Sequence, residues 1–96
     1  MNFGINVTYH TKPGKRQDFL DGLSAAGIRD AVRAEAGCLQ YDYYLSVSDP
    51  DEVLLVERWE SREAQKLHLT QPHMVKVREI KERLVDETVL TSYELS

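Results

Sequence analysis

The chain has 96 residues, and its 42% hydrophobic and 29% charged residues are typical of one small globular domain and not of a disordered chain. Its 12 Lys and Arg against 16 Asp and Glu give a net charge of −4, which argues against a nucleic-acid-binding protein because such proteins carry a basic excess. The single cysteine, Cys38, excludes an internal disulfide framework, and no apolar run approaches the roughly 20 residues of a membrane span.

The first third of the chain predicts a strand followed by a helix. Apolar residues alternate with polar ones over residues 3–9, which is typical of a half-buried strand. The next apolar residues recur at spacings of three and four from Phe19 to Ala26, which favours one face of a helix. Gly27 is expected to end or kink this helix, and Ile28 and Val32 continue its apolar face for two more turns, until Gly37.

The middle of the chain predicts a β-hairpin over residues 38–59. A long strand is expected at 38–47, where Leu39, Tyr41, Tyr43, Leu45 and Val47 alternate with other residues. Residues 49–52 have the Pro and Asp of a turn, and residues 53–59 then pair back as a second strand.

The last third predicts two helices and a final strand. Ser61 is the expected N-cap of a helix that runs to about His68 or Leu69, and Pro72 suits the first turn of a second helix. The inner stripe of that helix is predicted at Met74, Val77, Ile80 and Leu84, and residues 87–95 alternate again as a strand.

The element order is therefore β-α-β-β-α-β, the ferredoxin-like arrangement of the α+β class, with one antiparallel sheet and its helices on one face. The N-terminus lacks the regions of a signal peptide, so we expect one cytoplasmic domain over residues 1–96 with no membrane partner. The strands are apolar on both phases, since Tyr41 and Tyr44 have opposite phases in one strand, as do Leu54 and Leu55 in the next. Because a sheet of this kind needs cover on both faces, we expect a homodimer formed through the sheet faces.

The fold alone decides no function, so the candidate chemistry rests on a few side chains. His68 and His73 are five residues apart, which is wrong for two metal ligands on one helical face. From the residues alone, two interpretations of His68 are equally favoured: a functional group, or an imidazole that caps the C-terminal end of a helix. Trp59 at a strand end is more often core than catalytic, whereas Asn6 within a β-branched strand needs hydrogen-bonding partners if it is buried.

Three motifs together resemble the antibiotic biosynthesis monooxygenase family. They are Glu-Ala-Gly-Cys-Leu-Gln-Tyr at residues 35–41, Glu-Arg-Trp-Glu-Ser-Arg-Glu-Ala at residues 57–64, and the pair His68 and His73. The family usually has Pro where Ala36 stands, a harmless departure at the end of a helix. The specific part of the resemblance covers residues 35–73.

The resemblance implies a dimeric α+β barrel of two ferredoxin-like domains and an oxygenase that uses neither metal nor flavin. Such enzymes oxidise electron-rich hydroxyarenes, anthrones or quinols with dioxygen, because the deprotonated substrate itself supplies the electrons. On this resemblance we predict His68 as the base, Asn6 as the oxyanion donor and Trp59 as a further catalytic residue. Substrate-binding residues are predicted at Tyr41, Tyr43 and His73, with no metal or other cofactor.

Other branches of the family leave alternatives open. A heme-degrading branch is disfavoured, because its iron-ligand position falls near Arg78 and a cation cannot ligate iron. In an isomerase or degradation enzyme acting on a quorum-sensing-type phosphosugar, His68 and His73 would serve as a general acid and base. That enzyme needs a cationic clamp, for which Lys66, Lys76 or Arg29 are candidates. The third alternative is a non-catalytic dimer that binds a small molecule.

Overall fold

The computed structural model describes residues 2–95, and its element order confirms the predicted ferredoxin-like arrangement. Each predicted helical segment consists of two helices. The elements are β1 (Asn2–Thr11), α1 (Arg16–Ala25), α2 (Ile28–Arg33), β2 (Cys38–Leu45), β3 (Glu52–Trp59), α3 (Arg62–His68), α4 (His73–Leu84) and β4 (Val85–Leu95). Among residues 2–95, no helix combines the length and apolar character needed to span a membrane.

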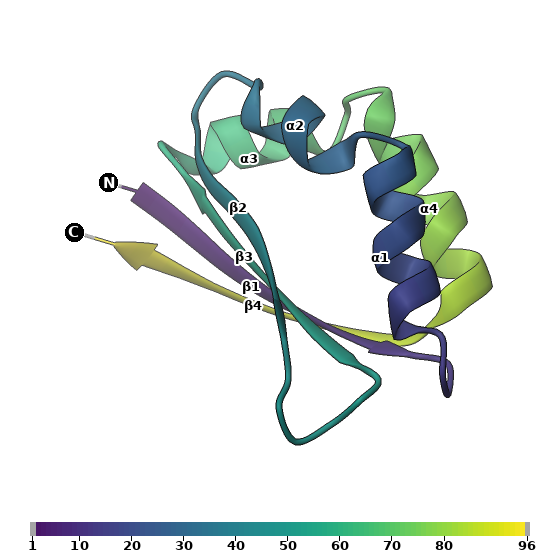
Figure 1. Cartoon of the computed structure of the whole chain (residues 1–96). Helices are drawn as coiled ribbons and strands as arrows, with labels where there is room; N and C mark the ends of the chain where they lie inside the picture. The colour runs from purple at the N-terminus through teal and green to yellow at the C-terminus, as the bar shows by residue number, and fades with distance from the viewer. Residues whose placement is uncertain (1, 96) are drawn as a thin grey trace.

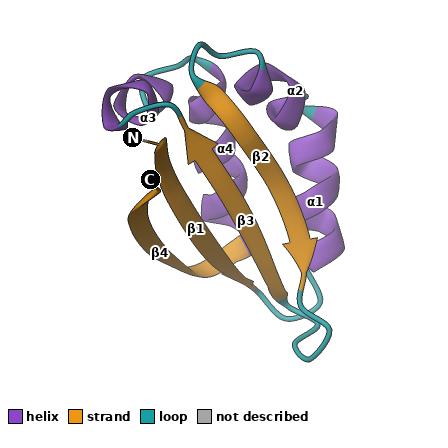
Figure 2. Ribbon diagram, turned by 90° about the vertical axis from the view of Figure 1, so that its left-hand side faces the viewer, coloured by secondary structure: helices purple, strands orange, loops and turns teal. Residues whose placement is uncertain are grey.

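The four strands form one antiparallel sheet in the order β2-β3-β1-β4. All four helices lie on one side of this sheet, as Figure 1 shows from the edge. Figure 2 looks onto the opposite face, where the strands lie in front and no helix covers them. We call the face under the helices the inner face and the other one the outer face.

Local sequence signals explain where the helices break. Gly27 has a left-handed φ of 65°, which ends α1 and turns the chain into α2. Ser61 is the N-cap of α3, as predicted, and its Oγ accepts a hydrogen bond of 3.1 Å from the Ala64 backbone N–H. Pro72 directly precedes α4. The short break between α3 and α4 brings the start of α4 beside the end of α3.

The core lies between the inner face and the helices, because inward side chains alternate along the strands. The predicted stripe of α4 is confirmed at Met74, Val77 and Ile80, which are buried, while Leu84 is half-buried. The other buried apolar residues are Phe3, Ile5, Val7, Tyr9, Phe19, Leu23, Ile28, Val32, Tyr41, Val53, Leu55 and Trp59.

The strand predicted at residues 38–47 begins at Cys38 as expected, but the prediction is wrong at its end and in the phase of Leu39. β2 ends at Leu45, so Val47 lies in the following turn and is fully exposed. The pairing of β2 with β3 shifts between Cys38 and Gln40, and Leu39 is therefore out of phase with Tyr41 and half exposed. Only Tyr41 and Tyr43 of the predicted alternating set pack against the core.

The outer face carries the second apolar phase that the sequence predicted. Leu54 and Val56 lie on β3 between neighbours of β1 and β2, and Tyr44 pairs with Leu54 across the β2–β3 ladder. The side chain of Tyr44 is 49% exposed, and that of Val89 on β4 is 47% exposed. Leu54 and Val56 are half-buried within the sheet. An apolar face that no helix covers is typical of an interaction surface.

Candidate functional site

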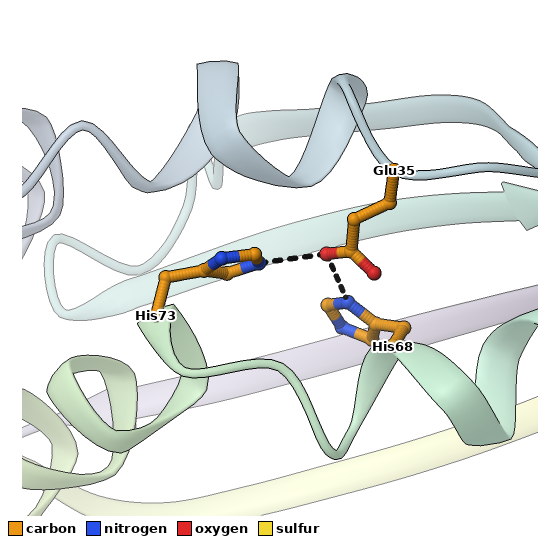
Figure 3. Close-up of side chains that lie close together, drawn as sticks. All are labelled: Glu35, His68 and His73. Atoms are coloured by element: carbon orange, nitrogen blue, oxygen red, sulfur yellow. Dashed lines mark hydrogen bonds and ion pairs between the residues drawn. The ribbon is translucent and has the colours of Figure 1, made fainter.

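A carboxylate and two imidazoles converge above the inner face of the sheet (Figure 3). Glu35 Oε2 lies 2.9 Å from His68 Nδ1 and 2.7 Å from His73 Nε2. The three residues come from the turn before β2, the end of α3 and the start of α4. If Glu35 is ionised, each of these nitrogens carries the hydrogen, which leaves His68 Nε2 with a free lone pair.

The backbone at Gly37 fixes the position of Glu35 relative to α3. Gly37 has a φ of 85°, and a Cβ at this position would lie 2.7 Å from Cβ of Ala64. The Gly37 carbonyl also accepts a hydrogen bond of 2.8 Å from the Glu60 backbone N–H. Only glycine combines this conformation with this close approach, so the Gly in the first motif holds the carboxylate over His68.

His68 is 1% exposed and is held on several sides by protein groups. Its ring lies 4.7 Å from the Trp59 ring at an interplanar angle of 35°, and 5.8 Å from the Tyr41 ring. Its Nε2 lies 3.9 Å from Oε1 of Glu57. That distance is too long for a direct hydrogen bond, so the two groups are neighbours that do not bond to each other.

Glu57 is a buried acid on the inner face of β3. The Trp59 Nε1–H donates a hydrogen bond of 3.0 Å to its Oε1. Burial raises the pKa of Glu57, an effect opposed by this hydrogen bond and by the neighbouring His68. The carboxyl group therefore holds its proton to higher pH than an exposed glutamate does.

The raised pKa of Glu57 makes stability depend on pH in a testable direction. The folded protein keeps this proton over a pH range in which the unfolded chain has lost it. The stability contribution of this proton is therefore complete below the unfolded pKa and disappears as pH rises through the folded one. Replacing Glu57 by Gln removes this titration and keeps an acceptor for Trp59. We expect urea unfolding to show Glu57→Gln gaining stability relative to wild type as the pH rises above about 4, the ordinary pKa of a glutamate. A difference that does not change with pH would contradict the assignment.

His68 and Glu57 both line a cavity of about 240 Å³ between the inner face and α3 and α4. Most of its wall is apolar or aromatic, including Val7, Tyr9, Tyr41, Leu69, Met74 and Val77. Burial raises the pKa of Tyr9 and of Tyr41, so both phenols stay protonated at neutral pH. The cavity is thus a mainly apolar chamber with one imidazole and one buried carboxyl group in its wall.

The structure brings some of the predicted site residues together and separates others. Trp59 stacks beside His68 and is not part of the cavity wall, and His73 contacts Glu35 instead of the cavity. Tyr43 packs edge-on against Tyr41 and lines a different hollow next to α1. Burial raises the pKa of Tyr43 to about 12.

Asn6 is not brought together with His68. Val7 lines the cavity, and its neighbour Asn6 lies on the outer face because successive side chains of a strand alternate. Asn6 Oδ1 accepts a hydrogen bond of 2.9 Å from the Tyr93 hydroxyl, whose ring packs over Gly4. Within one chain, an oxyanion donor at Asn6 has no access to the His68 cavity.

Glu35 and Glu57 are functional candidates to which sequence reasoning gave no role. For Glu57 a signal was present, because it is an acid on the same phase as Val53, Leu55 and Trp59. For Glu35 the only signal was its place as the first residue of the motif at residues 35–41. The ligand atoms of Glu35, His68 and His73 lie within 4.8 Å of one another, and a carboxylate with two imidazoles is a donor set that suits a transition metal.

Fold and site together define a class of small α+β proteins with a histidine–carboxylate cluster above an apolar cavity. The chain belongs to the antibiotic biosynthesis monooxygenase family, whose sequence model matches residues 2–80. The resemblance inferred from residues 35–73 is thereby confirmed.

Individual relatives agree with this assignment. "Putative monooxygenase YcnE" of Bacillus subtilis (strain 168) is 34% identical over 62 residues, which cover 65% of this chain and 63% of that protein, under two thirds of its length. The structure of Rv0793 from Mycobacterium tuberculosis matches with a TM-score of 0.87 and 27% identity, covering 100% of this chain and 96% of that one. PA3566 from Pseudomonas aeruginosa matches with a TM-score of 0.85 and 26% identity, covering 99% and 95%. The family and the named relative support a monooxygenase-like function in general.

Proposed function

We propose that this protein is a cofactor-independent monooxygenase that oxidises an electron-rich hydroxyarene or quinol with dioxygen. The observation that carries the proposal is the position of His68, whose Nε2 lies beside the Glu57 carboxyl group in the wall of a mainly apolar cavity. Chemistry of this kind needs a base, a proton relay and a chamber that limits access of water, and we assign these roles to His68, Glu57 and the apolar walls.

In the proposed first step, His68 Nε2 takes the proton of the substrate hydroxyl group. Glu35 holds the imidazole in the required tautomer through its contact with Nδ1, at 2.9 Å. Trp59 stacks on the ring and restricts its rotation, so we assign it a positioning role. Glu57, whose pKa is raised by burial, lies where it can act as the acid that returns a proton to a reduced oxygen species.

In the second step the deprotonated arene transfers electrons to dioxygen, and a carbon–oxygen bond forms at the activated ring carbon. One oxygen atom stays in the product and the other leaves as water. The substrate supplies all four electrons, as when a CH₂ group of an anthrone becomes a carbonyl group. The apolar walls exclude bulk water from these charged intermediates.

The direct test is oxygen uptake in the presence of a panel of quinols and anthrones. We expect uptake with at least one compound, one atom of ¹⁸O from labelled dioxygen in the product, and an unchanged rate after dialysis against EDTA. A rate lost on dialysis and restored by a transition metal would instead assign Glu35, His68 and His73 to metal binding. No uptake across the panel, together with proton exchange on a phosphosugar, would favour the isomerase alternative.

We also propose that the protein is a homodimer joined through the outer faces of two sheets. The exposed Tyr44 and Val89 and the half-buried Leu54 and Val56 on the outer face support this proposal, because a second copy would give the sheet its second cover.

A further inference from the structure

Two cations border the His68 cavity on the side away from the Glu35 cluster. Arg78 and Lys81 lie on α4, on the same helical face as Met74 and Val77, because these positions are three, four and seven residues apart. Arg78 is exposed and Lys81 is half-buried, so the pair forms a charged rim on an otherwise apolar wall.

Neither Arg78 nor Lys81 forms an ion pair within the described part of the chain, although Glu82, Asp86 and Glu87 line a neighbouring hollow with them. Among residues 2–95, no carboxylate oxygen lies within 4.0 Å of the charged nitrogens of Arg78 or Lys81, although Arg29, Arg33 and Arg62 all form such pairs. The Lys81 ammonium lies 5.5 Å from the centre of the Tyr9 ring, which forms part of the cavity wall. Burial lowers the pKa of Lys81, as expected for an ammonium group without a counterion.

We propose that Arg78 and Lys81 form an anion-binding subsite at the rim of the His68 cavity, and that the substrate is an arene carrying a carboxylate at the end opposite its reacting hydroxyl group. That the reacting group of the substrate is a hydroxyl rests on the proposed function. The anion-binding subsite does not depend on it. The volume of about 240 Å³ is below the roughly 300–1,000 Å³ of sites that hold drug-sized ligands, which suits a compound of one or two rings.

The subsite also explains how the orientation of the bound arene is set in a mainly apolar cavity. An arene held only by apolar contacts can enter with either end first. A carboxylate paired with the Arg78 guanidinium, which offers two parallel N–H donors, directs the other end of the ring toward His68 and Glu57. The cationic clamp that a phosphosugar enzyme needs would thus come from Arg78 and Lys81. None of Lys66, Lys76 and Arg29 lines this cavity.

Binding without turnover tests the subsite independently of oxygenase activity. Isothermal titration calorimetry under nitrogen compares the affinity for 6-hydroxy-2-naphthoate with that for its neutral carboxamide, which has the same rings and the same hydroxyl group. We expect wild type to bind the carboxylate at least about 10-fold more tightly. The double variant Arg78→Gln/Lys81→Gln is expected to lose this preference and to bind the carboxamide as wild type does.

The matched control is Lys76→Gln/Arg83→Gln, which removes the same charge from the same helix at positions outside the cavity wall. It is expected to keep the preference for the carboxylate. An equal loss in both double variants, or no preference in wild type, would overturn the subsite. Ribose 5-phosphate is expected to bind far more weakly than the naphthoate, and equal binding would overturn the assignment of an aromatic substrate. If the carboxylate binds as expected but no oxygen is consumed with any arene, the subsite stands and the oxygenase proposal fails.

Discussion

Replacing His68 by Gln is expected to lower kcat by about 10²–10⁴-fold, because the variant lacks the base that takes the substrate proton. Glutamine keeps an N–H group able to reach Glu35, so the loss is expected to be chemical and not structural. The measurement is oxygen uptake at saturating concentration of the best substrate of the panel, alongside thermal unfolding of both proteins. KM is expected to change little, because the variant keeps the apolar cavity walls and the two cations Arg78 and Lys81 on α4.

His10→Gln is the matched control, since His10 is a partly exposed histidine at the far end of β1, outside the cavity wall. Its activity is expected to equal that of wild type. If His68→Gln folds normally and turns over at the wild-type rate, His68 is not the base. Glu35→Gln gives an intermediate test, because it leaves the imidazole in place and removes the charge that fixes its tautomer.

Leu54→Arg is expected to convert the proposed homodimer to a monomer. Leu54 lies on the outer face of β3 between Thr8 and Tyr44, so in a sheet-to-sheet dimer its side chain is buried by the second copy. Losing a buried leucine costs about 1.5–3 kcal/mol, and a symmetric interface loses it twice. The dissociation constant is therefore expected to rise at least about 100-fold, before the cost of burying the charge is added.

The measurement is the mass in solution by light scattering across a range of protein concentrations. Leu67→Arg is the matched control, because Leu67 is an exposed leucine on α3, on the helical side of the sheet. This variant is expected to remain dimeric. A wild-type protein that is monomeric at micromolar concentration would contradict the dimer itself.

Most of the fold could be predicted from the sequence because it depends on short-range periodicity. The alternation in β1 and the three-and-four spacing of Met74, Val77 and Ile80 each specify an element and the face that it buries. The prediction failed at Leu39 and Val47, where a pairing shift and the end of an edge strand override the alternation. Neither feature has a local sequence signal, since both depend on how β2 meets β3.

The candidate site could be predicted only in part, because it is assembled from distant segments. His68 was identified through the family resemblance, and its spacing from His73 argued against two metal ligands on one helical face. The break between α3 and α4 places both rings against one oxygen of Glu35, which is 33 residues away from His68 in the chain. Asn6 was predicted as the oxyanion donor of the site, although its phase on β1 already placed it on the face opposite Val7.

The sequence by itself determined a small acidic α+β chain, its family, and a sheet with apolar residues on both faces, because composition, periodicity and motif spacing are properties of the linear chain. Only the tertiary structure decided which polar groups meet inside it. Glu57 faces His68 because β3 and α3 pack together, and Arg78 and Lys81 border the same cavity because α4 crosses the inner face of the sheet. Such contacts depend on packing between elements far apart in the chain, which no local pattern encodes.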